Sequence, residues 1–491
     1  MKNRHIGFLY AAAAVLLCGS ILSCGADAKT KDSSDPSGTS AGTDTQTAEP
    51  AETTLTDAVP ELDFGGTSLR TIQQEQATYY FYTDTENGEP VNDVIFQRNR
   101  HTEERFNVVI EESTVDVYST VSSLVRNAVT AGEDAYDLVL SQIFKSGSDA
   151  AAGYFYDWYE LPYIDLSMPW YTKSINEAAV GDKLFMVESD LSLSYTQQTW
   201  MMLYNATKAS ALDLPDFYEM VDNGTWTIDK LYEYSSTAYS DVNGDGTQDD
   251  GDFYGFAATP GGCLLTGYLY AGEGRLVEVS DDLALSYPIA EEHSIDVLTK
   301  ISRLFFDNPG AIKKTDALRG TRMSLFPKGN ILFEAMQAGD LILDDMRQMD
   351  DMFGVLPMPK YDESQSEYYT VVDGGADIMT IPITVTQTEM IGAVVEAMSA
   401  ESWQNVTGTY IDLALEQKGT RDERSVTMLR SILDSRIIDF GYLYDSGSGY
   451  ALKLETLVKN ADQLKSSIDK NMKAVNKFYE GVLDTLTSSE N

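Results

Sequence analysis

The sequence predicts an α/β fold divided into two lobes. The chain has 491 residues, well beyond the roughly 250–300 residues at which one hydrophobic core stops growing, so at least two domains are expected. Along the chain, helical periodicity alternates with short apolar runs, which is the pattern of helices separated by buried strands. Buried strands with helices between them indicate lobes that contain largely parallel sheets.

The individual elements follow from this pattern. Each predicted strand has a predicted helix beside it in the sequence. The helix–strand pairs are 91–106 with 108–110, 117–128 with 138–140, and a strand in GADIMTIPITV with a helix at 391–398. At the C-terminus, apolar residues from Leu464 to Leu486 are spaced 4-4-3-4-3-4. This spacing predicts one long amphipathic helix that packs against a lobe, with a coiled-coil partner helix as the alternative.

Composition and charge narrow the function classes. Hydrophobic residues at 43% and aromatic residues at 11% are enough for packed cores, so the chain is globular. The 77 acidic and 35 basic residues give a net charge of −42, and a surface this negative repels the phosphates of nucleic acids. We therefore expect no nucleic-acid partner.

The N-terminus has the layout of a bacterial lipoprotein signal. Lys2 and Arg4 precede an apolar run, and Ile21-Leu22-Ser23-Cys24 resembles a lipobox. Residues 1–23 are then a signal peptide that is removed, and Cys24 is the lipidated residue, on the outer face of the bacterial cytoplasmic membrane. An uncleaved membrane anchor is the alternative. Residues 24–61 are rich in Ser, Thr, Asp and Ala, and no aromatic residue occurs from Gly25 to Val59. This segment is expected to form a flexible tether.

Cysteine and histidine are too scarce for several kinds of site. Beyond the signal segment only Cys263 remains, so the folded body has no intrachain disulfide. His101 and His293 are far apart in the sequence. This excludes a multi-histidine zinc site and makes a Ser-His-Asp triad improbable.

An acidic loop, DVNGDGTQDDGD, matches the ligand register of an EF-hand calcium loop. Gly246 occupies the sixth position, where such a loop turns sharply, and the last ligand is Asp rather than Glu. A helix precedes the loop and a strand follows it, so we expect a structural calcium clasp rather than a sensor. An acidic surface turn is the alternative. The predicted calcium ligands are Asp241, Asn243, Asp245, Thr247, Asp249 and Asp252.

Aromatic residues gather in two segments, of which the second also contains turn formers and acids. One is Tyr79-Tyr80-Phe81-Tyr82, and the other, YFYDWYELPYIDLSMPWY, contains Trp158, Trp170 and Tyr171. Such rings can stack on sugar rings while carboxylates accept hydroxyl hydrogen bonds. Alternatively, the rings fill the boundary between core and loop. With 77 acidic residues no catalytic carboxylate pair can be singled out, so we predict that the protein is not an enzyme.

Several blocks together resemble the extracellular solute-binding proteins of bacterial ABC importers, the sugar-binding type known as family 1. The likeness extends from about Leu62 onward. After the lipobox and tether, the blocks are GEPVNDVIFQRNRHTEERFNVVI, AGEDAYDLVL, ELPYIDLSMPWY, MLYN, GTWTIDKLYEYSSTAYSDVNGDGTQDDGDFYGF, FGVLPMPKYDESQSEYYTVVDGGADIMTIP and RDERSVTML.

This resemblance implies a type II periplasmic-binding-protein-like fold, in which two lobes are joined by crossing strands and close over a ligand. Lobe one would comprise residues 62–188 and 362–436, and lobe two residues 189–361 and 437–491. The crossings are expected near 185–191, 357–361 and 437–443.

The resemblance also implies which residues line the interlobe cleft. They follow the first strands, precede or follow the first crossing, or lie in the loop before GADIMTIP. The predicted ligand-binding residues are Tyr80, Gln142, Trp170, Tyr171, Trp200, Gly374 and Gly375.

The sequence thus predicts a monomeric, lipid-anchored protein that binds a carbohydrate and delivers it to the permease of an ABC importer. Three alternatives stay open: the same fold with a peptide or another solute as ligand, a secreted glycosidase, and a lipoprotein adhesin without a small ligand.

Overall fold

The computed structural model describes residues 55–258, 260–312, 325–415, 423–445 and 449–488. The predicted signal peptide, the lipidation residue Cys24 and the tether up to residue 54 lie outside the described residues. Every described helix and strand belongs to one compact unit, residues 55–491. Among its described helices, none is both long and apolar enough to cross a membrane.

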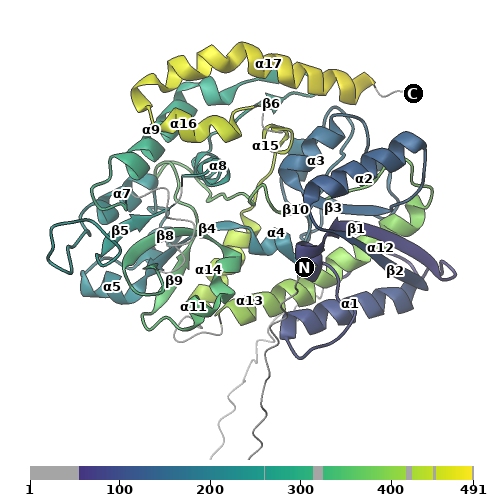
Figure 1. Ribbon diagram of the computed structural model, residues 1–491, viewed down its shortest axis with the longest axis horizontal. Helices are drawn as coiled ribbons and strands as arrows, with labels where there is room; N and C mark the ends of the chain where they lie inside the picture. The colour runs from purple at the N-terminus through teal and green to yellow at the C-terminus, as the bar shows by residue number, and fades with distance from the viewer. Residues whose placement is uncertain (1–54, 259, 313–324, 416–422, 446–448, 489–491) are drawn as a thin grey trace, which may run out of the picture. The chain divides into compact units, whose positions relative to one another are not determined.

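The first sheet has the strand order β10-β3-β1-β2 and is drawn in purple, blue and green in Figure 1. Strand β1 is parallel to both β2 and β3, with Thr71 opposite Glu112 and Leu138. Strand β10 is antiparallel to β3. The strands are β1 (Thr67–Gln74), β2 (Val108–Val115), β3 (Leu138–Gln142) and β10 (Asp377–Thr380).

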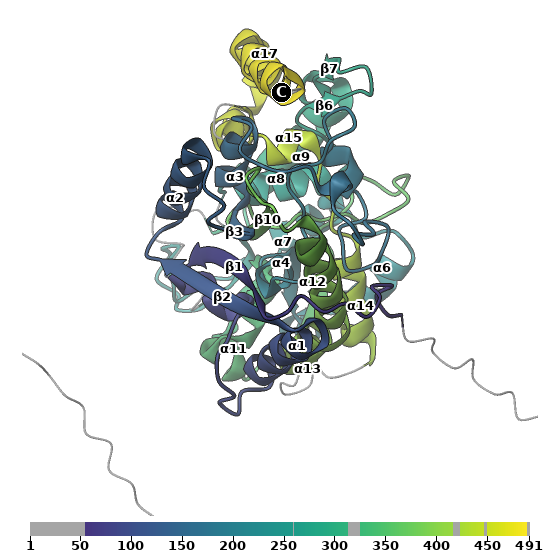
Figure 2. The ribbon, with the colours of Figure 1, turned by 90° about the vertical axis from the view of Figure 1, so that its right-hand side faces the viewer.

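The helices around this sheet confirm the three helix–strand pairs of the sequence. Helix α1 begins with a proline at its first position and is capped by Asn107, whose left-handed backbone lets its N–H donate to the Glu103 carbonyl. Helix α1 lies beside α12 and α13, as Figure 2 also shows. We call the first sheet and these four helices lobe one: α1 (Pro90–Phe106), α2 (Tyr118–Ala131), α3 (Ile143–Ala150) and α12 (Thr388–Glu401).

The second sheet has the order β5-β8-β4-β9. Strand β4 is antiparallel to both of its neighbours, and only β5 and β8 pair in parallel. The expectation of largely parallel sheets is therefore correct for the first sheet and wrong for the second. The strands are β4 (Trp200–Asn205), β5 (Tyr254–Ala257), β8 (Ile331–Gln337) and β9 (Phe353–Leu356).

The physical reason is where each strand comes from. Strand β4 arrives from lobe one, just as β10 arrives from the second sheet, and each is antiparallel to its neighbours. A short passage between two sheets sets the direction in which a strand enters, whereas helix-connected strands within a lobe run parallel. Periodicity along one strand carries no information about that direction.

The second sheet and its helices form what we call lobe two. Helix α7 packs on β5 and α9, and α8 packs on α9. The named helices are α7 (Ile228–Ser236), α8 (Gly262–Ala271) and α9 (Glu292–Phe306).

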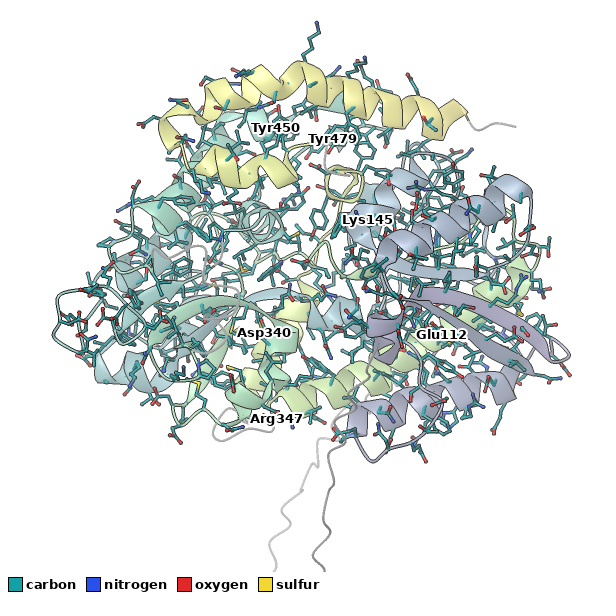
Figure 3. The ribbon with its side chains drawn as sticks, viewed as in Figure 1. Glu112, Lys145, Asp340, Arg347, Tyr450 and Tyr479 are labelled. Atoms are coloured by element: carbon teal, nitrogen blue, oxygen red, sulfur yellow. The ribbon has the colours of Figure 1, made fainter. Side chains whose placement is uncertain are left out.

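The C-terminal helix α17 (Leu464–Ser488) confirms the long amphipathic helix. Its buried stripe includes Ile468, Val475 and Tyr479 and contacts α9. Tyr479 points inward from α17 in Figure 3. Its hydroxyl donates to the Gly441 carbonyl at 3.1 Å. The helix therefore packs against the body of the fold, as its spacing predicts.

The remaining described elements are shorter or connect the lobes. The helices are α4 (Leu193–Gln197), α5 (Ala206–Ala211), α6 (Phe217–Asp222), α11 (Asp344–Arg347), α13 (Thr407–Leu415), α14 (Glu423–Asp434), α15 (Phe440–Leu443) and α16 (Leu454–Val458). The short turns of helix are η1 (Glu75–Tyr80), η2 (Trp158–Glu160), η3 (Ile175–Ala178), η4 (Pro288–Ala290), η5 (Ala338–Ile342), η6 (Ser402–Val406), η7 (Ala451–Lys453) and η8 (Ala461–Gln463). Strands β6 (Glu278–Val279) and β7 (Leu285–Ser286) form a two-stranded sheet.

Three passages of the chain join the lobes and pair with one another. Thr199 of the first passage bridges Val372 of the second, and Thr370 of the second bridges Arg436 of the third. Lys360 still pairs with Thr227, so the second passage begins after residue 360. These bridges join the three passages into one connection between the lobes.

The residue limits predicted for the lobes stay a prediction. Helix α14, placed in lobe one by those limits, lies against β9 of the second sheet. At the end of the predicted tether, Asp57 pairs with Arg105 at 2.8 Å and Val59 is buried.

Candidate functional site

Four of the seven predicted ligand residues come together where the lobes meet. Gln142 ends β3 and pairs with Asp377 at the start of β10, two residues beyond Gly375. The backbone of Asp373 donates to the Gln198 carbonyl at 2.9 Å, two residues before Trp200. We call this region, formed by residues 142–144, 198–200 and 373–375, the junction.

The glycines of the junction leave room for closely packed neighbours. A side chain on Gly374 would lie 3.1 Å from the Phe144 ring and 3.4 Å from Sγ of Cys263. One on Gly375 would lie 3.3 Å from Oε1 of Gln198 and 3.8 Å from Nε2 of Gln142. Side chains from separate segments, including Phe144 and Cys263, therefore lie against the backbone of Gly374 and Gly375. A ligand held between two lobes needs such a meeting of segments, and glycine lets them approach closely.

Trp200 lies at the first position of β4, on the inner side of the junction. Its indole is 6% exposed, and its Nε1 has no hydrogen-bond partner within the described part of the chain. Its backbone is fixed by Val371, whose carbonyl accepts from Trp200 N at 3.2 Å. The backbone of Trp200 is thus anchored beside the junction, and its indole N–H has no acceptor among the described residues.

Tyr80 belongs to an element that contacts the first passage, whereas Trp170 and Tyr171 are buried against other residues. Tyr80 ends η1, which contacts α4 of the first passage. Trp170 is fully buried in lobe one against the Trp403 ring, with 6.3 Å between ring centroids. The Tyr171 hydroxyl donates to Glu396 at 2.7 Å. The burial of these two rings matches the alternative that they fill the boundary between core and loop.

Sequence reasoning missed three polar or aromatic groups of the junction. Phe144 is 39% exposed, and Gln198 and Asp373 are half-exposed. Oδ1 of Asp373 accepts from Gly375 N at 2.8 Å. Phe144 could have been found from its place two residues after the end of a buried strand, but Gln198 and Asp373 lie in passages without periodicity.

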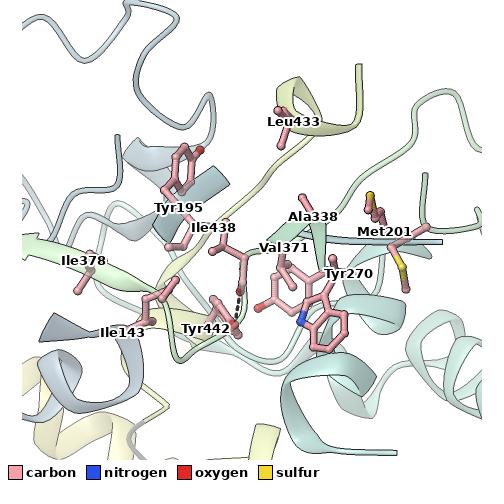
Figure 4. Close-up of a cluster of buried hydrophobic side chains, with 14 of the residues drawn as sticks. Ile143, Tyr195, Met201, Tyr270, Ala338, Val371, Ile378, Leu433, Ile438 and Tyr442 are labelled. Atoms are coloured by element: carbon pink, nitrogen blue, oxygen red, sulfur yellow. Dashed lines mark hydrogen bonds between the residues drawn. The ribbon is translucent and has the colours of Figure 1, made fainter. Parts of the chain in front are cut away.

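A buried polar network joins the first and third passages beneath the junction. Arg436 pairs with Asp190 at 3.5 Å and stacks over the Tyr195 ring at 3.6 Å. Burial raises the pKa of Glu188 to about 8, while Arg436 and a hydrogen bond from Thr172 oppose that rise. Figure 4 shows Tyr195 among the apolar residues of the passages. This network anchors the passages to one another.

The predicted calcium loop is closed by a backbone pair between Ser240 and Phe253, which donate to each other's carbonyls at 2.9 and 3.0 Å. It leads from α7, which ends at Ser236, to β5. The loop turns at Gly244 and Gly246, both with φ of +74°, a conformation that favours glycine.

The loop's side-chain oxygens accept hydrogen bonds from its own backbone. Asp241 accepts from Gly244 N at 2.7 Å and Gly246 N at 2.9 Å, and Asp252, which is buried, accepts from Val242 N at 3.2 Å. Within the described residues, no group of three or more His, Cys, Asp or Glu is close enough to hold a metal ion. The oxygen donors fit calcium in type and in sequence register, and they would have to draw together around an ion.

Two cavities lie beside the passages and away from the junction. One, of about 750 Å³, is bordered by the second and third passages and includes Tyr368, Tyr369 and Arg436. The other, of about 580 Å³, lies between residues 176–181 and 275–281. None of the seven predicted ligand residues lines either cavity.

No family model and no curated protein matches this sequence. Solved structures do match. The cyclic alpha-maltosyl-1,6-maltose binding protein from Arthrobacter globiformis has a TM-score of 0.56 at 15% identity, over 85% of this chain and 99% of the other. The ABC substrate-binding protein Lmo0181 from Listeria monocytogenes, in complex with cycloalternan, has 0.55 at 12%, over 84% and 99%.

A third match is the GacH receptor of Streptomyces glaucescens, solved unliganded and with acarbose, with a TM-score of 0.52 at 14% identity, over 85% of this chain and 99% of the other. Identities this low show shared architecture only. Together with the two sheets and the three paired passages, they show that this chain has the two-lobed α/β fold of the solute-binding proteins of ABC transporters.

Proposed function

We propose that this protein binds a carbohydrate at the junction and delivers it to an ABC importer, without catalysing a reaction. The observation that carries the proposal is the meeting of Gln142, Trp200, Gly374 and Gly375 at the boundary between two lobes. The fold supports it, because the similar structures include the ABC substrate-binding protein Lmo0181 in complex with cycloalternan and a cyclo/maltodextrin-binding protein complexed with maltotetraose. Peptide and other solutes are the competing ligands.

The chemistry of the junction suits a sugar. The half-exposed amides of Gln142 and Gln198 donate and accept, and the carboxylate of Asp373 accepts, as hydroxyl groups require. The exposed Phe144 ring offers an apolar face for stacking. A ligand that contacts both lobes favours their closed arrangement, because it gains contacts only there.

The first test measures sugar binding to the purified protein by calorimetry, with maltotetraose, cycloalternan and acarbose as probes. We expect at least one to bind, and Phe144→Ala to weaken that binding by about 2- to 10-fold, since a stacked ring contributes about 0.5–1.5 kcal/mol. Tyr159→Ala, which removes an exposed ring elsewhere in lobe one, is the matched control. Binding of peptides but of no sugar would refute the carbohydrate proposal.

The proposal includes export and anchoring through Cys24 on the outer face of the cytoplasmic membrane, with the chain acting as a monomer. The lipobox-like run before Cys24 supports anchoring. Intact-mass measurement of the protein from membranes should give a chain that begins at a diacylglyceryl-modified Cys24.

We also propose that the loop 241–252 binds Ca²⁺ as a clasp between α7 and β5. Its EF-hand register and its two left-handed glycines support this. Calcium at 100 times its Kd should raise the free energy of unfolding by about 2.7 kcal/mol. Asp241→Asn should remove most of this gain, whereas Asp250→Asn, in the same loop but outside the ligand register, should keep it. Unfolding that is indifferent to Ca²⁺ and EGTA would contradict the clasp.

A further inference from the structure

Arg98 is a charged residue that lies entirely inside the protein. It belongs to α1 and is 0% exposed. Burial lowers the pKa of Arg98 to about 9, and the charge of Glu401 opposes that shift, so the guanidinium is cationic at neutral pH. A buried charge is costly unless hydrogen bonds compensate it. The acceptors of the Arg98 side chain therefore show what this residue holds in place.

The guanidinium of Arg98 donates to acceptors on separate segments of the chain. Its Nη1 donates to the Leu191 carbonyl at 2.9 Å and to Oγ of Ser402 at 2.8 Å. Its Nη2 donates to the Phe81 carbonyl and to Oδ1 of Asn99, the latter at 2.7 Å. Its Nε donates to the same Asn99 oxygen at 3.1 Å. None of these acceptors is a carboxylate, so the positive charge strengthens bonds to carbonyl, amide and hydroxyl oxygens.

The planar shape of the guanidinium allows one side chain to join these segments. Two nitrogens of a single rigid plane serve the carbonyls of Leu191 and Phe81. The Phe81 ring also lies close to the guanidinium, with 5.5 Å between Cζ of Arg98 and the ring centroid. A lysine carries all of its donors on one nitrogen and lacks this fork. Arg98 therefore fixes the spacing between the segment after η1 and the chain around Leu191.

Leu191 lies just before α4, the helix of the first passage. Lobe one also holds α4 at a second point, where Asp377 N of β10 donates to Oγ of Ser194 at 2.7 Å. Helix α4 ends directly before Gln198, and Trp200 begins β4 soon after. Because so few residues separate α4 from the junction, the position of α4 determines where Gln198 and Trp200 lie.

The other two acceptors differ in what they connect to Arg98. Phe81 follows η1, which itself contacts α4. Ser402 begins η6, a π-helical turn between α12 and α13 that packs on α1, and such turns are frequent at functional sites. The bond to Ser402 ties Arg98 to neighbouring helices and not to the first passage. It therefore offers a way to separate support of the fold from the hold on α4.

We infer that Arg98 is a positioning residue for ligand binding: it holds the start of the first passage against the segment after η1, so that Gln198 and Trp200 are in place before a ligand arrives. This role rests on the proposed function of the junction. A site whose groups are already ordered loses less conformational freedom when a ligand binds. Loss of the hold should therefore weaken binding although Arg98 itself does not touch the ligand.

Calorimetry with the sugar that binds wild type measures this effect. Arg98→Lys should weaken binding at least about tenfold, because a single ammonium cannot hold both carbonyls in the same geometry. Asn99→Ala removes the oxygen that orients the guanidinium and should weaken binding several-fold, whereas Asn99→Asp keeps an acceptor there and should retain wild-type affinity. Ser402→Ala is the matched control. It should lower the melting temperature, because Arg98 loses an acceptor, and leave the affinity unchanged.

Hydrogen exchange followed by mass spectrometry tests the hold on α4 without any sugar. Arg98→Lys and Asn99→Ala should speed the exchange of the α4 amides, whereas Asn99→Asp and Ser402→Ala should keep the wild-type rate. If Arg98→Lys does not fold, the two Asn99 variants decide. Unchanged exchange in α4, or an affinity that falls no further in Asn99→Ala than in Ser402→Ala, would overturn the inference. A wild type that binds no sugar, with variants that show the expected exchange, would refute only the proposed function.

Discussion

Gly255→Ala should lower the free energy of unfolding by about 3 kcal/mol or more. Gly255 lies in β5, where an added Cβ would overlap the carbonyl of Ser235 in α7. Gly310 approaches the same carbonyl, and its own carbonyl accepts from Gly255 N at 2.8 Å. Because backbone contacts backbone here, no side chain can move aside, and the overlap costs at least as much as overpacking in a core.

Urea unfolding followed by circular dichroism measures this loss. Gly481→Ala is the control: Gly481 is exposed in the middle of α17, and a Cβ there meets nothing within 4 Å. This substitution should raise stability by up to about 1 kcal/mol, since alanine favours a helix. Equal stabilities of Gly255→Ala and wild type would show that α7 and β5 are not packed as described.

Gly147→Ala should weaken binding of any ligand that draws the lobes together, by at least about tenfold, which corresponds to about 1.4 kcal/mol. Gly147 in α3 of lobe one faces α15, where an added Cβ would overlap the Leu443 carbonyl. On the other side of α15, Gly441 packs just as closely on the backbone of Val277. The short helix is thus held between lobe-one and lobe-two backbone, and a methyl group on α3 pushes lobe one away.

Calorimetry with the sugar that binds wild type, together with small-angle scattering, measures this effect. Gly408→Ala in α13, where a Cβ meets nothing within 4 Å, should retain wild-type affinity. A melting temperature near wild type in Gly147→Ala would separate loss of closure from loss of folding. Unchanged affinity and dimensions would show that α3 and α15 need not touch in the bound state.

Local patterns predicted well wherever one chain segment determines its own structure. The helix–strand pairs up to β3 and the helix α17 follow from spacing alone, because periodicity records which face of an element is buried. The resemblance likewise anticipated that Gln142, Trp200, Gly374 and Gly375 lie near one another. The resemblance could not show whether Trp170 contacts a ligand or lies in the core, because aromatic residues occur in both places.

Groups that act only through distant partners escaped prediction. Phe144 becomes a candidate because the second passage brings Gly374 against it. Asp439 likewise meets Tyr270 and Arg275, which lie more than 150 residues away in the sequence. The loop 241–252 is the opposite case, since all of its oxygens come from one short segment.

By itself the sequence determined the α/β class, the division into two lobes and the order of helices and strands, because the buried face of a helix or strand appears as a regular spacing of apolar residues. Only the tertiary structure decided the direction of β4 in the second sheet, the pairing of the three passages, and which rings and carboxylates face open space. These features depend on where segments distant in sequence meet, and packing between such segments produces no regular spacing of residues in the sequence.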